Sequence, residues 1–468
     1  MSILDVLEPL YKVLPEVKPP EVPPGLNKKI MWSAIALLLF FVLGNISLIG
    51  VEPSSIAYWE QLQTIIASNM GTLISAGIGP IVLASIILQL LVGGQFLNID
   101  LSNPVDRARF QGMQKLFALA LCFLEGAALV IGGSPLLPST PAGIDFVTLS
   151  LLERIPYALP IIFQIALGSI ILLYLDELVS KHGIGSGIGL FIAGGVAGRF
   201  FWQVFRPPIG IGDPGGVILQ FIASLSTGAN FLILLPVLIA IGIFMIIVFA
   251  EGMHVNIPIT MGRKGTGGRF PVKLLYVSNM PVILAATLFI NVQLWAQLAG
   301  GIPILGQIMG AIAWATKSPF SIFLNILLRF GAEGPAAIVA MAPDILQAAV
   351  YLVVLIAACI VFGVFWVQMG NQSPEAVAEQ LQRSGMYIPG FRRDPRIVKK
   401  VLDRYIPTIV IMGSVFVGLL AGLGDMALAG LANGTGILLT VGIIYRLYEE
   451  LAKEQLAAMH PMLGSLFG

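Results

Sequence analysis

The chain has 468 residues, of which 57% are hydrophobic and 11% are charged, and its formal net charge is +1. Soluble domains carry about a quarter charged residues, so this composition, with a mean hydropathy of +0.92, excludes an ordinary soluble protein and predicts a membrane protein. Both cysteines, Cys122 and Cys359, lie in apolar runs, which gives no support for a disulfide framework or a thiolate metal site.

The first 29 residues (1–29) are predicted to form a segment of their own. Its apolar residues fall on one helical face, which predicts a helix lying along the bilayer surface; they are Ile3, Leu4, Leu7, Leu10, Tyr11 and Leu14. The alternative is a disordered tail. A proline-rich linker, PEVKPPEVPPG, follows. Asp5 and Glu8 precede any lysine, which argues against a signal peptide.

Stretches with few or no charges predict ten membrane-spanning helices, since one crossing needs about 20 apolar residues. In chain order they are 30–51, 72–97, 116–144, 155–175, 184–205, 214–250, 274–316, 345–374, 405–424 and 426–445. Glycines and a proline interrupt the long run before residue 99, so residues 60–70 are expected to form a short separate segment. The predicted fold class is therefore an all-α polytopic membrane protein.

The distribution of basic residues predicts the topology. With both termini in the cytoplasm, all but five of the 26 lysines and arginines fall on the cytoplasmic side; the five are Arg154, Arg199, Arg206, Lys317 and Arg329. Cytoplasmic loops of membrane proteins carry such an excess of positive charge, and the agreement also supports the number of spans.

The tract KHGIGSGIGLFIAGG (181–195) has glycine at every second position from Gly183 to Gly189. A nucleotide-binding loop needs a strand before the glycines and an acidic residue about 20 positions later, and neither is predicted here. We expect instead that small residues let helices approach closely or bend. The sequence has no Walker-type loop and no helix-borne His–Glu–His set, so no nucleotide, cofactor, metal site or catalytic residue is expected.

Two basic inserts are predicted on the cytoplasmic side, within 251–273 and 370–404. In the first, GRKGTGGR (262–269) lies between the alternating stretches HVNIPITM and FPVKLLYV, which predicts a hairpin with a basic tip. In the second, Ser373-Pro374-Glu375 predicts the start of a helix that ends before Gly385. Asp394-Pro395 predicts the start of another helix that continues into the ninth span. Such loops suit a phosphate-rich partner; the alternative is ordinary positively charged loops.

Glu125 and Asn291 are polar residues inside predicted spans. An ionisable side chain within the membrane is a functional candidate, although it can also serve only to hydrogen-bond a neighbouring helix. From these observations the chain is a ten-helix protein of a transport type, with cytoplasmic docking loops and an unidentified cargo.

Seven motifs resemble the SecY family, the channel-forming (alpha) subunits of the Sec protein translocon, in its archaeal and eukaryotic branch. They are GTLISAGIGPIV (71–82), FQGMQKL (110–116), ILLYLDELVSKHGIGSGIGLFI (171–192), YVSNMPVILAATLFINVQLW (276–295), FGVFWV (362–367), SGMYIPGFR (384–392) and NGTGILLTVGIIYRLYEEL (433–451). They cover nearly every predicted span in order.

The resemblance implies two inverted five-helix halves, 30–206 and 207–468, around a central pore. It also implies a protein-conducting channel that translocates secretory polypeptides and releases transmembrane segments sideways into lipid, and it implies no enzymatic activity. A secondary transporter of a small solute is the alternative, since it shares inverted repeats and broken helices. The aliphatic character of the central positions disfavours it. An intramembrane enzyme is disfavoured because no nucleophile–base pair is evident.

The resemblance also implies roles for particular residues. A pore ring would consist of Ile78, Val82, Ile188, Ile192, Ile283 and Leu439. A plug would span 60–70 and include Glu60, Gln63, Ile66 and Met70. A lateral gate between the second and third and the seventh and eighth spans would contain Glu125, Asn291 and Leu83, where the family usually has threonine at the last position. Ribosome or partner docking would involve Arg263, Lys264, Arg269, Arg392 and Arg393, with Arg392 at the arginine of the family's PGxR motif.

The partners that the resemblance implies are small membrane subunits of the SecE (gamma) type and of the beta type, the ribosome, signal peptides, nascent polypeptides and membrane lipid. No nucleotide is implied. The expected location is the cell (plasma) membrane, with multiple crossings and both termini in the cytoplasm.

Overall fold

The computed structural model describes most of the chain. The described ranges are 13–22, 24–51, 69–93, 103–131, 151–208, 214–226, 230–261, 266–273, 279–299, 303–319, 322–369, 372–383, 386–387, 395–428 and 433–459, with a few single positions between them. Nearly all of the predicted surface helix (3–14) and of the predicted segment 60–70 lies outside the described residues.

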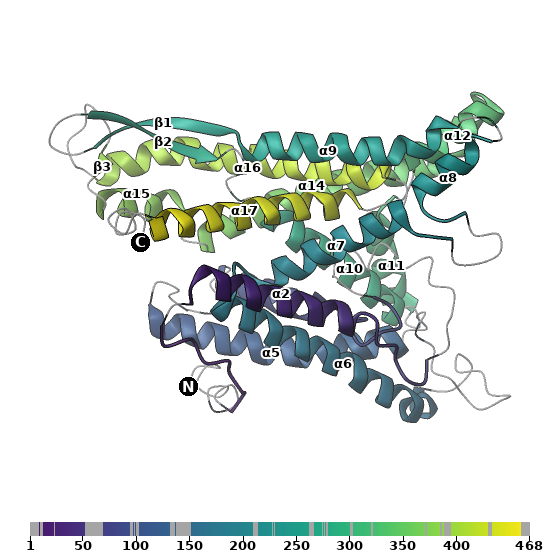
Figure 1. Ribbon diagram of the computed structural model, residues 1–468, viewed down its shortest axis with the longest axis horizontal. Helices are drawn as coiled ribbons and strands as arrows, with labels where there is room; N and C mark the ends of the chain where they lie inside the picture. The colour runs from purple at the N-terminus through teal and green to yellow at the C-terminus, as the bar shows by residue number, and fades with distance from the viewer. Residues whose placement is uncertain are drawn as a thin grey trace.

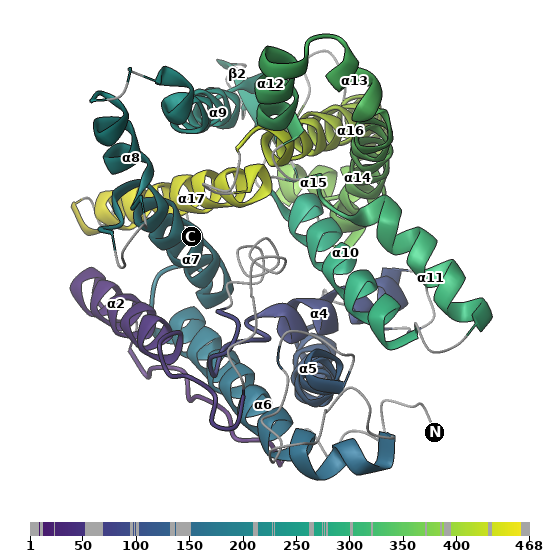
Figure 2. The same cartoon turned by 90° about the vertical axis from the view of Figure 1, so that its right-hand side faces the viewer.

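Among the described residues, a helix lies at each of the ten predicted spans (Figure 1; α4 is labelled in Figure 2). They are α2 (Leu26–Leu43), α4 (Gly79–Gly93), α5 (Pro104–Ile131), α6 (Leu151–His182), α7 (Gly187–Phe205), α9 (Leu235–Glu251), α10 (Met280–Ala299), α14 (Ala342–Met369), α16 (Pro395–Ala427) and α17 (Gly434–Met459). Eight helices of the described chain are long and apolar enough to cross a membrane, and α4 and α17 are not among them. The helix α4 is short because the chain before it turns at Gly71 and Gly77, whose φ angles are +81° and +57°.

Two of the predicted stretches are wrong as single spans, because each is longer than one crossing needs. Residues 214–250 form α8 (Val217–Ser224), the short 3-10 helix η3 (Phe231–Leu234) and then α9. Residues 274–316 contain α10 and a second helix, α11 (Pro303–Thr316), and two more helices, α12 (Ile322–Glu333) and α13 (Ala336–Ala340), precede α14. The sequence GGIP separates α10 from α11.

The helices form two groups that meet along the middle of the molecule. In Figure 2, α2, α4, α5 and α6 lie on one side, whereas α9, α10, α14, α16 and α17 lie on the other. The helix α4 contacts α10 directly, and α7, which packs against α2 and α6 of the first group, contacts α17 of the second. The largest apolar cluster includes residues of both groups, so the core lies where the two groups face each other.

A small sheet lies at one end of the bundle, which we call the hairpin end (left in Figure 1). It contains β1 (His254–Met261), β2 (Thr266–Lys273) and β3 (Met386–Tyr387), in the antiparallel order β2-β1-β3. The predicted hairpin is confirmed, but its second strand begins inside the tract 262–269, because strand pairing continues to Met261 and Thr266. Because β3 belongs to the second predicted insert and pairs with β1 of the first, the two inserts share one sheet.

The second insert begins as its sequence predicts. The helix α15 (Pro374–Arg383) follows Ser373, whose Oγ accepts a hydrogen bond from the N–H of Ala376 at 3.3 Å. A serine at this position satisfies one of the free N–H groups of a first helical turn. The helix α16 starts at Pro395 and continues without interruption as the ninth predicted span.

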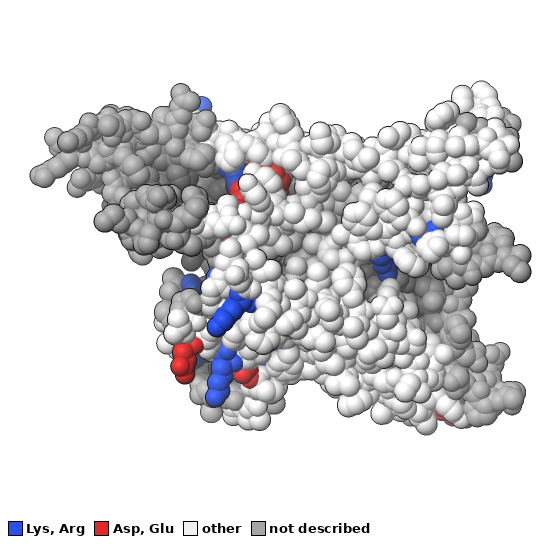
Figure 3. Space-filling model, viewed as in Figure 1, with Lys and Arg blue, Asp and Glu red and all other residues white. Residues whose placement is uncertain are grey.

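The proline-rich linker is held against α5 and α6 at the hairpin end. The Nζ atom of Lys181 donates to Glu16 Oε1 at 3.0 Å and to the Val17 carbonyl at 2.6 Å. Glu177 accepts hydrogen bonds from both Lys181, at 2.9 Å, and Lys115, at 2.8 Å. Figure 3 shows charged side chains gathered toward this end of the face, whereas its middle is nearly free of them.

Candidate functional site

The glycine tract 181–195 allows two helices to meet almost without a gap. The helix α6 ends at His182, Gly185 has a φ of +67°, and α7 begins at Gly187. The carboxylate of Asp176 accepts a hydrogen bond from the N–H of Ile188 at 2.8 Å. A Cβ atom at Gly187 would lie 2.5 Å from the Cα atom of Asp176. These contacts support the packing interpretation of the tract.

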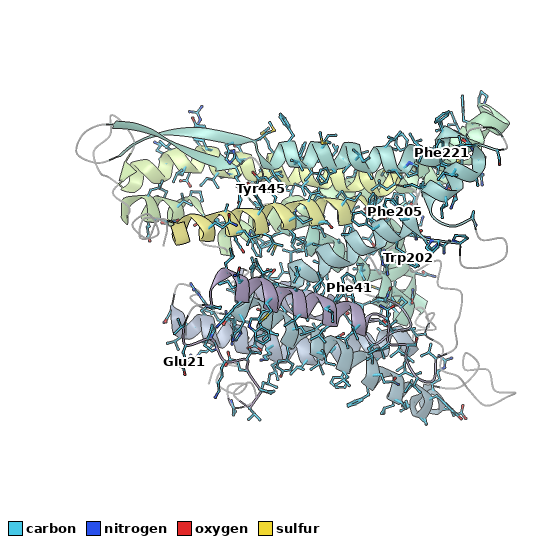
Figure 4. The ribbon with its side chains drawn as sticks, viewed as in Figure 1. Glu21, Phe41, Trp202, Phe205, Phe221 and Tyr445 are labelled. Carbon is cyan, nitrogen blue, oxygen red and sulfur yellow. The ribbon has the colours of Figure 1, made fainter. Side chains whose placement is uncertain are left out.

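Later glycines of the same helix face α2. A Cβ atom at Gly194 would lie 2.5 Å from Leu37 Cδ1, and one at Gly198 would lie 3.3 Å from the ring of Phe41. Phe41 is labelled in Figure 4, in α2. The side chain of Phe191, on α7, stacks on Phe40 with ring centroids 5.2 Å apart. The helix α7 is therefore fixed between α6 and α2.

Replacing Gly187 with alanine is expected to destabilise the protein by about 1–3 kcal/mol, because an inserted methyl group would force backbone atoms apart. The matched control is Gly242→Ala on α9, where nothing lies within 4 Å of an added Cβ atom and alanine is the better helix former by about 0.5–1 kcal/mol. The midpoint of thermal unfolding can be measured in detergent with a thiol-reactive dye, which reports when the buried Cys122 and Cys359 become exposed. Equal midpoints for the two variants would contradict the packing argument.

The six residues of the implied pore ring come from both helix groups. Ile78 precedes α4 and Val82 lies in it, Ile188 and Ile192 lie in α7, Ile283 in α10 and Leu439 in α17. Ile78, Val82, Ile192 and Leu439 are buried, whereas Ile188 and Ile283 are half-buried. All six belong to one apolar cluster or pack against it. The structure thus places these six aliphatic residues in, or against, one apolar cluster that includes both helix groups.

The three residues of the implied gate lie on helices that contact one another. Leu83 on α4, Glu125 on α5 and Asn291 on α10 are each at most 2% exposed. The Nδ2 atom of Asn291 donates to the Thr287 carbonyl of its own helix at 3.0 Å. Among the described residues, Glu125 Oε1 and Asn291 Oδ1 have no hydrogen-bond partner. Within the described part of the chain these two buried acceptor oxygens lack donors, and such groups cost about 1–3 kcal/mol each.

Of the implied plug residues, the structure describes Met70. Its side chain is buried in an apolar cluster with residues of α5, α6 and α10. Glu60, Gln63 and Ile66 lie outside the described residues. The neighbouring Asn69 donates to the Gly44 carbonyl at 2.8 Å and accepts from Arg199 Nη2 at 3.1 Å. Asn69 lies inside the predicted plug range and Arg199 inside a predicted span, but the sequence did not predict that they meet.

The implied docking residues lie mostly outside the described part of the chain. This is so for Arg263, Lys264, Arg392 and Arg393, whereas Arg269 lies in β2 and pairs with Pro258 of β1.

The base of the hairpin is attached to α17. Lys273, at the end of β2, donates to Glu449 Oε1 at 2.5 Å, and its Nζ atom lies 5.1 Å from the ring centroid of Tyr445. Tyr445 is labelled in Figure 4. The hairpin is thus connected directly to the helix that carries Leu439.

No group of three or more histidine, cysteine, aspartate or glutamate side chains that could hold a metal ion occurs within the described ranges. The central cluster of these ranges is made of apolar side chains. Such a cluster can form a tight apolar contact.

Comparisons with known proteins agree with the motifs quoted above. The SecY family matches residues 72–448, and the family described as the plug domain of Sec61p matches residues 38–71. The protein translocase subunit SecY of Methanothermobacter thermautotrophicus is 43% identical over 485 residues, which cover 100% of this chain and 99% of the relative. That of Methanococcus vannielii is 41% identical and covers 99% of each chain.

Solved structures give the same result. A protein-conducting channel is 40% identical, with a TM-score of 0.79 and coverage of 98% of this chain and 99% of that one. Sec61 in the canine ribosome–channel complex from the endoplasmic reticulum is 39% identical, with a TM-score of 0.76 and the same coverage. With a family match over most of its length and relatives above 40% identity along all of it, this chain belongs to the SecY family.

Proposed function

We propose that this chain forms a protein-conducting channel that moves secretory polypeptides across a membrane and releases transmembrane segments sideways into lipid. The observation that carries the proposal is the full-length similarity to protein translocase subunits and to a solved protein-conducting channel. The apolar cluster shared by the two helix groups supports it. A solute transporter needs polar groups near the bilayer midplane to hold its substrate, whereas the matched central positions here are aliphatic.

The two helix groups would be the halves of the channel, 30–206 and 207–468, and the pore ring would be its narrowest point. Apolar side chains suit this role, because they adapt to many passing sequences and disfavour water in an empty constriction. The plug (60–70) would close one side of the ring. Burial of Met70 against α5, α6 and α10 supports this placement.

Topology and partners complete the proposal. The hairpin end would face the cytoplasm together with both termini, in the plasma membrane, and the two basic inserts would dock the ribosome. One structural relative is a ribosome–channel complex, and β3 makes both inserts part of one sheet. Small subunits of the SecE and beta types would bind the exposed apolar faces of the helices, and the segment 1–29 would lie on the cytoplasmic surface.

Reconstitution tests the proposed function. Vesicles that contain the full chain with its small subunits are expected to protect a secretory precursor from added protease, whereas the same precursor without its signal segment stays accessible. Vesicles that protect neither precursor but accumulate a small solute would overturn the proposal.

The lateral gate would lie between α4 and α5 on one side and α10 and α14 on the other. Replacing Leu83 with threonine is expected to raise the hydrophobicity that a passing segment needs in order to enter lipid. The new hydroxyl group can donate to an acceptor oxygen of Glu125 or Asn291 and so hold the gate helices together. A hydrogen bond in a membrane is worth about 0.6–1.7 kcal/mol, which is equivalent to roughly one to three leucines in the test segment.

An insertion assay with test segments of graded leucine content measures this threshold. The control Leu83→Val has nearly the shape of threonine without its hydroxyl group, and it is expected to leave the midpoint near that of the parent. In the Glu125→Leu, Asn291→Leu background the threonine has no acceptor, so its effect should disappear. A threonine effect that persists there would show that the polar pair is not the acceptor.

A further inference from the structure

A buried carboxylate joins three helices of the second group. Asp425 lies near the end of α16 and is 4% exposed. Its Oδ2 atom accepts hydrogen bonds from the hydroxyl of Tyr351 at 2.8 Å and of Thr435 at 3.0 Å. Its Oδ1 atom accepts from the backbone N–H of Thr435 at 3.1 Å. Both carboxylate oxygens therefore have donors, and these donors come from α14 and α17.

The ends of α16 and α17 are in backbone contact at the same place. A Cβ atom at Gly424 would lie 2.5 Å from the Cα atom of Gly434, so only glycine fits. The carboxylate of Asp425 accepts a hydrogen bond from the N–H of Thr435, in the first turn of α17. The partial positive charge at the amino end of a helix favours an anion there. The start of α17 is thus fixed to the end of α16.

Tyr351 brings α14 to the same carboxylate. Elsewhere the contact between α14 and α16 is mostly apolar, with Gly418 against Ile356 and Gly422 against Leu352, and the Ser414 hydroxyl lies against Gly363. A buried hydrogen bond with a fixed geometry defines the position along the helix axis more sharply than apolar contact does. The ring of Tyr351 also meets Phe289 of α10, with centroids 6.2 Å apart.

We propose that Asp425 and Tyr351 are positioning residues that make α14, α16 and α17 move as one body when the lateral gate opens. This proposal rests on the proposed channel function. The helix α14 is one of the gate helices, and Leu439 of the pore ring lies about one helical turn after Thr435. If the three helices move together when the gate opens, Leu439 moves with them and the shape of the pore ring changes at the same time. A gate opened by α14 alone leaves Leu439 in place.

Pulsed electron paramagnetic resonance on the full chain in nanodiscs distinguishes these two motions. Spin labels at Leu346 on α14 and Met412 on α16, which are 61% and 59% exposed, report movement within the body. Labels at Leu346 and at Leu124 on α5, which is 49% exposed, report the gate. The background replaces Cys122 and Cys359 with alanine. The opening probe is a synthetic peptide with a charged amino end and about ten consecutive leucines.

In the parent protein the peptide is expected to lengthen the distance between positions 124 and 346 and to leave the 346–412 distribution unchanged. In Tyr351→Phe, which keeps the ring but removes the donor, a second population should appear in the 346–412 distribution. With Tyr351 intact, Asp425→Asn keeps an acceptor oxygen and should retain most of the single population, whereas Asp425→Leu should show the second population. Thr440→Val is the matched control, because the hydrogen bond that the Thr440 hydroxyl makes to a described residue is within its own helix, to the Gly436 carbonyl at 2.9 Å.

A 346–412 distribution in Tyr351→Phe identical to that of the parent, with and without peptide, would overturn the proposal. A peptide that changes the 346–412 distance in the parent would overturn it as well. These distances require no translocation, so a parent that fails the precursor assay but shows the expected distances refutes the channel function and not the positioning role.

Discussion

Serine at Ile78, Ile188 and Ile283 together should make the resting channel conduct ions. Each replacement removes an aliphatic side chain whose burial is worth about 1.5–3 kcal/mol, and it places a hydroxyl group where water was disfavoured. Three such changes at one constriction are expected to raise ionic conductance in planar bilayers at least roughly tenfold, since each 1.4 kcal/mol corresponds to a factor of about ten.

The control replaces three isoleucines that the apolar cluster does not include. Ile241, Ile308 and Ile411 lie on α9, α11 and α16 and are 53%, 54% and 44% exposed, so serine there should leave conductance at background. Background conductance in the ring variant, with normal amounts of folded protein, would show that the six aliphatic residues do not form the constriction.

Reversing Arg263, Lys264 and Arg269 to glutamate should weaken ribosome binding strongly and reduce its salt dependence. Basic side chains that neutralise phosphates release counterions, and each lost phosphate contact lowers the slope of log K against log salt by about one. Three contacts would therefore lower the slope by about three units, with the largest loss of affinity at low salt.

Co-sedimentation of the reconstituted channel with ribosomes, at several salt concentrations, gives both quantities. The matched control reverses Lys28 and Lys29 at the start of α2, which are basic but lie outside the two inserts. An unchanged slope in the hairpin variant would mean that these residues make no phosphate contact. An equal effect of the control would mean that only general surface charge matters.

The sequence alone determined the membrane class, the ten helices and the helix starts at Pro374 and Pro395. These depend on local properties: the length of an apolar run, the bias of basic residues and capping chemistry at a helix start. The family was also evident from long motifs. Boundaries were less well predicted. The charge of Asp425 predicts a limit between two spans, whereas α16 continues through this residue to Ala427.

The tertiary structure decided which residues meet. No local pattern indicates that Gly187 lies against Asp176, that β3 joins the hairpin, or that Lys273 pairs with Glu449 on α17. The last two contacts join residues far apart in the chain, and all three depend on how the helices and strands pack. The same holds for Asp425. A charged residue in an apolar run predicts the end of a helix. The packing of α14 and α17 around Asp425 supplies the hydrogen-bond donors that allow its carboxylate to be buried.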